Sequence, residues 1–94
     1  MERTEVQSRV KGVVSRVLKI DENQISENSN FIFDLGADSM QSLELVAGFE
    51  EEFDIEMDQD RAREFQNFDG AVNFIIENVR KISFSLILIL LSVH

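Results

Sequence analysis

The sequence predicts a small all-α domain, and three observations lead to this prediction. The chain has 94 residues, which is enough for one domain. Apolar residues recur at helical spacing in several segments, and no segment alternates convincingly at the period of two that a strand requires. Cysteine is absent, so the domain has no disulfide framework, and this fits a reducing compartment.

The first segment predicts an amphipathic helix that starts at Thr4 and ends near Lys19. Thr4 and Gln7 have the spacing of a capping box. Apolar side chains follow at i, i+4, i+7, i+8, i+11 and i+12, the period of one helix face. These residues are Val6, Val10, Val13, Val14, Val17 and Leu18.

A polar loop, "DENQISENSN", separates this helix from the next. It lacks the mid-loop glycine and the acidic twelfth ligand of a calcium-binding loop, so we reject calcium binding there. The segment "FIFDLG", residues 31–36, follows it. We expect this segment to place apolar side chains in the core before a turn at Gly36.

The second predicted helix begins at Ser39, with Asp38 as its N-cap and Gln41 as the reciprocal partner of a capping box. It has two apolar faces. The first is about 100° wide, as expected of a core stripe, and comprises Leu45, Val46, Phe49 and Phe53. The second comprises Met40, Leu43 and Ala47 and is bordered by Glu44 and Glu51. Periodicity alone leaves open whether this second face is core or an exposed strip.

Two more helices are predicted toward the end of the chain. Asp58 can cap a short helix that ends near Phe65, and Asn67 can cap a last helix. The apolar residues of this last helix are Ala71, Val72, Ile75, Ile76 and Val79. Residues 82–93 are apolar but would span only about 18 Å as a helix, too short for a hydrocarbon core of about 30 Å. We therefore expect a peripheral tail and no transmembrane segment.

The acidic residues are concentrated in the middle of the chain. The net charge is −9, and Asp21 to Asp60 contains thirteen acidic residues and neither lysine nor arginine. A field of this sign attracts basic surfaces and repels nucleic acid. The charge therefore indicates either a solvated face or a docking surface for basic partners, and it argues against a nucleic-acid-binding protein.

The residues around Ser39 do not predict an enzyme. A serine nucleophile needs a base within reach, and the one histidine is the terminal His94. With no cysteine and one histidine, a zinc site is not expected. A hydroxyl in the first turn of a helix can instead be modified by another enzyme, because the helix dipole favours an attached phosphate. The alternative is an ordinary polar residue at the helix start.

The stretch "DLGADSMQSLELV" resembles the signature of acyl carrier proteins, and the similarity extends over roughly residues 4–81. The resemblance implies a four-helix bundle with three longer helices, a short third helix and a long loop between helices one and two. It implies that residues 1–81 form the carrier domain and that residues 82–94 form a tail. It also implies that Ser39 bears 4′-phosphopantetheine, with coenzyme A and a phosphopantetheinyl transferase as its source.

The resemblance further implies the partners and the pathway. Asp38, Met40, Leu43, Glu44, Ala47 and Glu51 would face acyl-transferring enzymes with basic docking patches. The function it implies is a monomeric acyl carrier in fatty acid biosynthesis that catalyses no reaction itself. The first residues, "MERTEVQSRVKG", have no apolar core of a signal peptide, so we expect a cytoplasmic protein. Met40 in the place of a usual leucine, and the small Ala47 and Gly48, leave open a carrier for a lipopolysaccharide, lipid or secondary-metabolite pathway. An unmodified structural or regulatory module is the alternative from another class.

Overall fold

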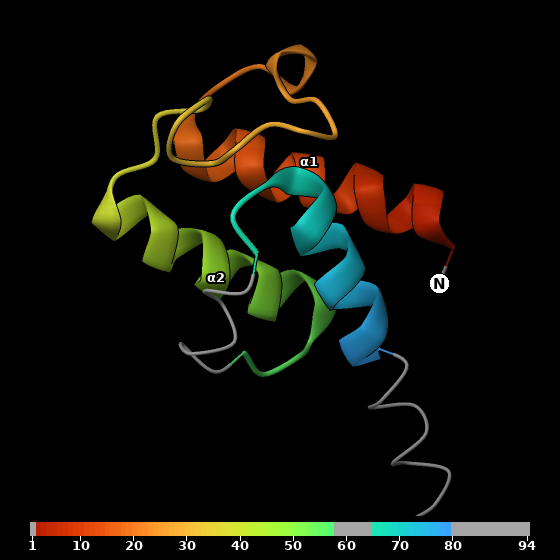
Figure 1. Ribbon diagram of the computed structural model, residues 1–94. Helices are drawn as coiled ribbons and strands as arrows, with labels where there is room; N and C mark the ends of the chain where they lie inside the picture. The colour runs from red at the N-terminus through yellow and green to blue at the C-terminus, as the bar shows by residue number, and fades with distance from the viewer. Residues whose placement is uncertain (1, 58–64, 80–94) are drawn as a thin grey trace, which may run out of the picture.

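The computed structural model describes residues 2–57 and 65–79. The order of elements is α1 (Arg3–Leu18), a short 3-10 helix η1 (Glu22–Gln24), α2 (Ser39–Phe53), and a last helix whose described part is 68–79 (Figure 1). None of the described residues forms a strand, and Asn30 and Asn67 make an isolated antiparallel bridge. The all-α class is therefore confirmed for this part of the chain. The predicted short helix after Asp58 and the tail 82–94 lie outside the described residues.

The predicted start of α1 is wrong. Glu2 is the N-cap, and no side chain caps this end of the helix, so Thr4 and Gln7 do not form a capping box. The first turn has a tertiary partner instead, because Arg3 contacts Asp69 and Asn73 of the last helix at 2.6 Å each. The predicted end is confirmed, since Lys19 is the C-cap in a left-handed conformation with φ 56°.

Helices α1 and α2 pack antiparallel and closely. Arg9 of α1 donates to the Glu52 carboxylate near the end of α2, whereas Val13, one turn further along α1, lies against Gly48. A Cβ atom at Gly48 would lie 2.8 Å from Cγ1 of Val13. This glycine in the middle of a helix is therefore explained by the approach of a buried side chain.

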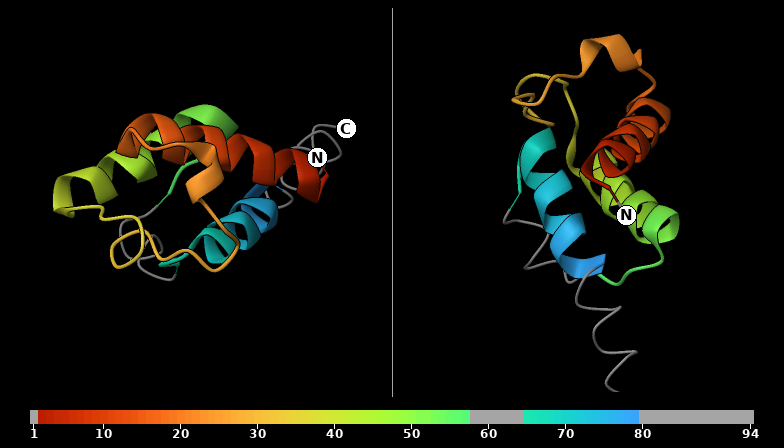
Figure 2. Two further views of the ribbon diagram at one scale, coloured as in Figure 1. Left: turned by 90° about the horizontal axis from the view of Figure 1, so that it is seen from above. Right: turned by 90° about the vertical axis from the view of Figure 1, so that its right-hand side faces the viewer.

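Figure 2 shows how α1, α2 and the last helix are arranged around one another, and these three helices contribute most of the buried core residues. The predicted core positions of α1 and of the last helix are buried or pack at the edge of the core. Phe49 of α2 is fully buried, with ring centroids 6.4 Å from Phe31 and 6.2 Å from Phe65. Phe65 in turn contacts Phe74 at 5.3 Å. These four rings join α2, the long loop and the last helix.

The long loop is hydrogen-bonded to the start of the last helix. Phe31 N donates to Gln66 O at 3.0 Å, and Phe68 N donates to Ser29 O at 2.9 Å. The last helix itself has the predicted cap, because Asn67 Oδ1 accepts from the Gly70 amide at 2.7 Å. The loop and this helix start therefore form one connected wall beside α2.

Candidate functional site

The start of α2 has the predicted capping box. Asp38 Oδ1 accepts from Gln41 N at 2.7 Å, and Gln41 Oε1 accepts from Asp38 N at 3.1 Å. The turn before it lies at Gly36, whose φ is 75°, a value that favours glycine. The sequence therefore fixes the beginning of α2 at Ser39 through purely local interactions.

Ser39 is the first residue of α2, and it is exposed. Its hydroxyl makes no hydrogen bond to any residue that the structure describes. The nearby Ser42 differs, because its Oγ donates to Asp38 O at 2.9 Å. Of these two serines at the helix start, Ser39 is thus the one whose hydroxyl is free to react.

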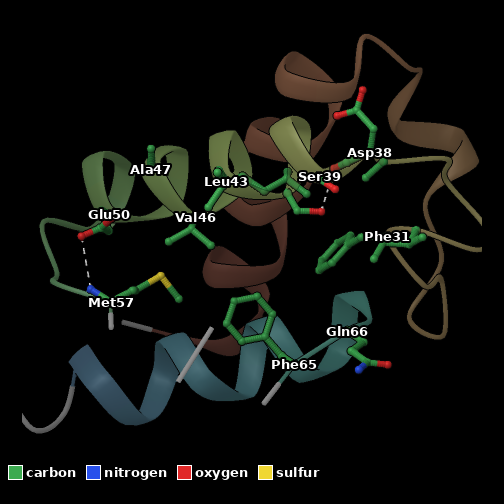
Figure 3. Close-up of a pocket in the computed structure, with 14 residues that line it drawn as sticks. Phe31, Asp38, Ser39, Leu43, Val46, Ala47, Glu50, Met57, Phe65 and Gln66 are labelled. Atoms are coloured by element: carbon green, nitrogen blue, oxygen red, sulfur yellow. Dashed lines mark hydrogen bonds between the residues drawn. The ribbon is translucent and has the colours of Figure 1, made fainter. Parts of the chain in front are cut away.

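A pocket with a volume of about 900 Å³ opens beside Ser39. Figure 3 shows Ser39 and the ring of Phe31 at one end of the pocket and Met57 at the other, with Leu43 and Val46 of α2 and the ring of Phe65 between them. Near Met57 the backbone N–H of that residue donates to Glu50 Oε2 at 3.2 Å. An apolar chain attached at Ser39 can therefore enter a pocket whose walls are mostly apolar.

The start of α2 also fits an attached phosphate. The backbone amides of Ser39 and Met40 donate to no residue in the described ranges 2–57 and 65–79, whereas Gln41 N is used by the capping box. Free amides at a helix N-terminus, together with the positive end of the helix dipole, favour an anion. The residues present therefore fit a phosphodiester on Ser39.

The expectation for residues 31–36 was only partly right. Phe31 is buried and Leu35 packs at the edge of the core, but Ile32 is 52% exposed and Phe33 is 85% exposed. The reason is a turn in which Asn30 Oδ1 accepts from both Ile32 N and Phe33 N. This turn directs two of the predicted core side chains into solvent.

The second apolar face of α2 is exposed, which resolves the question that periodicity left open. Met40 is 69% and Leu43 is 56% exposed, and Ala47 is exposed as well. The acidic side chains predicted around this face, Asp38, Glu44 and Glu51, are also exposed. Of the core face, Leu45, Phe49 and Phe53 are buried, and Val46 lines the pocket.

Sequence reasoning missed several residues of this site. Ile32 was expected in the core but lines the pocket, and Phe33 lies next to it. Glu50 and Met57 close the far end of the pocket, although neither was singled out as a site residue. Asn30, with Asp34 four residues on, was the available signal for the turn at Ile32 and Phe33, because asparagine and aspartate favour such turns.

Residues 2–57 and 65–79 contain no group of three or more His, Cys, Asp or Glu side chains placed to hold a metal ion. Within the same ranges, every helix is too short or too polar to cross a bilayer.

A family model described as the phosphopantetheine attachment site matches residues 8–75. The match covers more than half of the 94 residues and includes α2, the pocket and most of α1. Proteins of this family bear 4′-phosphopantetheine as a covalently bound group.

Proposed function

The chain belongs to the phosphopantetheine attachment site family, and on that premise we propose that Ser39 is the residue that bears 4′-phosphopantetheine. The observation that supports this assignment is the exposed Ser39 hydroxyl at the start of α2, beside the mouth of a largely apolar pocket. The free amides of Ser39 and Met40 add to it, because they can donate hydrogen bonds to the phosphate of the attached group.

The attachment is a phosphoryl transfer to Ser39. The Ser39 Oγ forms a bond to the phosphorus atom that carries pantetheine in coenzyme A, and the bond from that phosphorus to the bridging oxygen of the diphosphate breaks. The adenosine part of coenzyme A leaves with the bridging oxygen, and the hydroxyl proton passes to a base on the transferase. Ser42 is not equivalent, because its hydroxyl is already donated to Asp38 O.

When bound, the group supplies a terminal thiol on which acyl chains are carried as thioesters. The chain's own residues position and shelter what is attached. Leu43, Val46 and Phe65 offer an apolar wall for an acyl chain, and the exposed strip of Met40, Leu43 and Ala47 faces partner enzymes. With no cysteine in the sequence, the attached group is the only source of a thiol.

The pathway that we propose is fatty acid biosynthesis. The second candidate is a carrier for a lipopolysaccharide, lipid or secondary-metabolite pathway. The observation that favours it is the volume of the pocket, about 900 Å³, which leaves room for a longer acyl group. Measuring how well long-chain thioesters on the protein resist hydrolysis distinguishes the two, because a larger pocket protects longer chains.

We also propose that the domain is a four-helix bundle over residues 1–81 with a short third helix, and that residues 82–94 are a peripheral tail. The protein is a cytoplasmic monomer without enzymatic activity. Its partners are a phosphopantetheinyl transferase and acyl-transferring enzymes whose basic patches face Asp38, Glu44 and Glu51.

The test is the intact mass of the protein after incubation with coenzyme A, magnesium and a phosphopantetheinyl transferase. We expect addition of one phosphopantetheine to the wild type and to Ser42→Ala, and none to Ser39→Ala. Ser42→Ala is the matched control, because it removes a hydroxyl from the same helix start. An unmodified wild type that is helical by circular dichroism would refute the carrier function and favour an unmodified interaction module.

A further inference from the structure

The large hydrophobic side chains that are exposed among the described residues all lie at one end of the molecule. They come from the turn before α2 and from the first turns of α2. We call these residues the exposed apolar patch: Ile32, Phe33, Met40 and Leu43. Phe33 is the most exposed of them, at 85%.

Part of the patch lies at the pocket beside Ser39. Ile32 and Leu43 line the same pocket as Ser39, so these three residues meet at its mouth. Phe33 follows Ile32 in the chain, and Met40 follows Ser39. An enzyme that brings a reactant to the Ser39 hydroxyl therefore reaches the molecule beside Ile32 and Leu43, with Phe33 next to Ile32 in the chain.

The turn that carries Phe33 is held by a set of hydrogen bonds. Asn30 Oδ1 accepts from Phe33 N at 2.9 Å, and Asp34 Oδ2 accepts from Asn30 N at 2.7 Å. Ala37 N donates to Phe31 O at 2.8 Å and closes the turn. Because the backbone is already ordered, a partner that contacts Phe33 does not have to order this loop, which favours binding.

Exposure of Phe33 does not serve the stability of the domain, because an aromatic ring contributes to folding when it leaves water. The charges around Phe33 indicate which kind of partner contacts this ring. Asp34, Asp38 and Glu44 are exposed beside the patch, and residues 21–60 contain no lysine or arginine. A basic protein surface is complementary to this field, whereas a second copy of the chain, with its net charge of −9, and an anionic membrane are both repelled.

We propose that Phe33 is the anchor by which the transferase that modifies Ser39 recognises this chain. The ring enters an apolar pocket on the transferase, and lysine and arginine side chains at the rim of that pocket face Asp34, Asp38 and Glu44. Aromatic residues that fill a pocket at the centre of an interface commonly dominate its binding energy. This inference rests on the proposed function, because it presupposes that Ser39 is modified.

The experiment compares Phe33→Ser, Phe33→Leu and Asn28→Ser with the wild type, using the transferase that modifies the wild type. The KM and kcat of modification come from intact-mass time courses, and the Kd comes from calorimetric titration without coenzyme A. We expect Phe33→Ser to raise KM and Kd about tenfold with kcat retained, which corresponds to about 1.4 kcal/mol of binding. Phe33→Leu keeps an apolar side chain and should stay within about threefold of the wild type. Asn28→Ser, at an exposed loop position, should leave both values unchanged.

Equal KM and Kd for the wild type and Phe33→Ser would overturn the anchor while leaving the proposed function intact. A wild type that is never modified would instead refute the proposed function itself. Two further measurements test whether the exposed apolar patch binds a second copy of the chain or a membrane instead. Unchanged KM together with self-association that Phe33→Ser abolishes in sedimentation would assign the patch to a second copy. Unchanged KM together with Phe33-dependent binding to phosphatidylcholine vesicles would assign it to a membrane.

Discussion

Replacing Gly48 by alanine should destabilise the domain, although alanine is the better helix former. The added Cβ would lie 2.8 Å from Val13 Cγ1 and 3.7 Å from Val17 Cγ2. Val13 is 1% exposed and has a β-branched side chain with one strongly preferred rotamer in a helix, so its methyl group cannot turn aside. The clash can be relieved only if α1 and α2 move apart.

The expected magnitude is the difference between two opposing effects. Alanine is favoured over glycine in a helix interior by about 1 kcal/mol. Adding a methyl group to a tightly packed core costs about 1–3 kcal/mol. Taking the middle of that range, Gly48→Ala should lower the free energy of unfolding by about 1 kcal/mol. For a domain of this size, that corresponds to a decrease of about 4–8 °C in Tm.

Gly12→Ala is the matched control. Gly12 is exposed in the middle of α1, and a Cβ there would meet no atom within 4 Å. The same substitution should therefore raise the free energy of unfolding by about 1 kcal/mol through helix propensity alone. Urea unfolding followed by circular dichroism at the helical band measures both variants against the wild type.

A second control removes the clashing methyl groups. In a Val13→Ala background, Gly48→Ala should no longer destabilise the domain and should instead stabilise it by about 1 kcal/mol. The packing argument would be refuted if Gly48→Ala were as stable as the wild type or more stable. It would also be refuted if the cost of Gly48→Ala were the same with alanine at position 13.

Two further predictions concern the cap and the aromatic core. Asp38→Ala should lower the free energy of unfolding by about 1 kcal/mol because the capping box is lost, whereas Asp38→Asn should keep most of it; equal stability of the two variants in urea would contradict this. Phe49→Ala should lower the free energy of unfolding by about 3–5 kcal/mol because a fully buried ring is removed. Phe33 is exposed, so Phe33→Ala should change the free energy of unfolding by no more than about 0.5 kcal/mol. Thermal melts of Phe49→Ala and Phe33→Ala check this difference in stability. Similar Tm values would show that burial of the ring does not decide how much stability is lost.

The sequence allowed accurate prediction where the determining interactions are local. The start of α2 depends on Asp38 and Gln41, which are three residues apart, and the structure has the capping box at that position. The cap of the last helix by Asn67 is local in the same way. Helical period also grouped Met40 and Leu43 on one face of α2, although it left open whether that face is core or exposed.

Prediction was less accurate where distant contacts decide the outcome. The N-terminus of α1 extends beyond Thr4, and its first turn is held by contacts of Arg3 with Asp69 and Asn73, which lie more than sixty residues away. The close approach of Val13 to Gly48 likewise joins two helices, and periodicity within either helix does not reveal it. Composition also cannot tell which apolar residue of a loop is buried.

The two ends of the pocket differ in how firmly they are built. At the Phe31 end, the wall is joined to the last helix by backbone hydrogen bonds, including Phe31 N to Gln66 O, and its rings are packed against one another. At the other end, the hydrogen bond that the Met57 amide makes within the described residues goes to a side chain, that of Glu50, at 3.2 Å. Within the described residues, the two ends therefore differ in their hydrogen bonding, with backbone partners at the Phe31 end and a side-chain partner at the Met57 end. An acyl chain longer than the pocket would therefore break the hydrogen bond between Met57 and Glu50 and extend the pocket at that end. The aromatic wall at the Phe31 end would keep its shape.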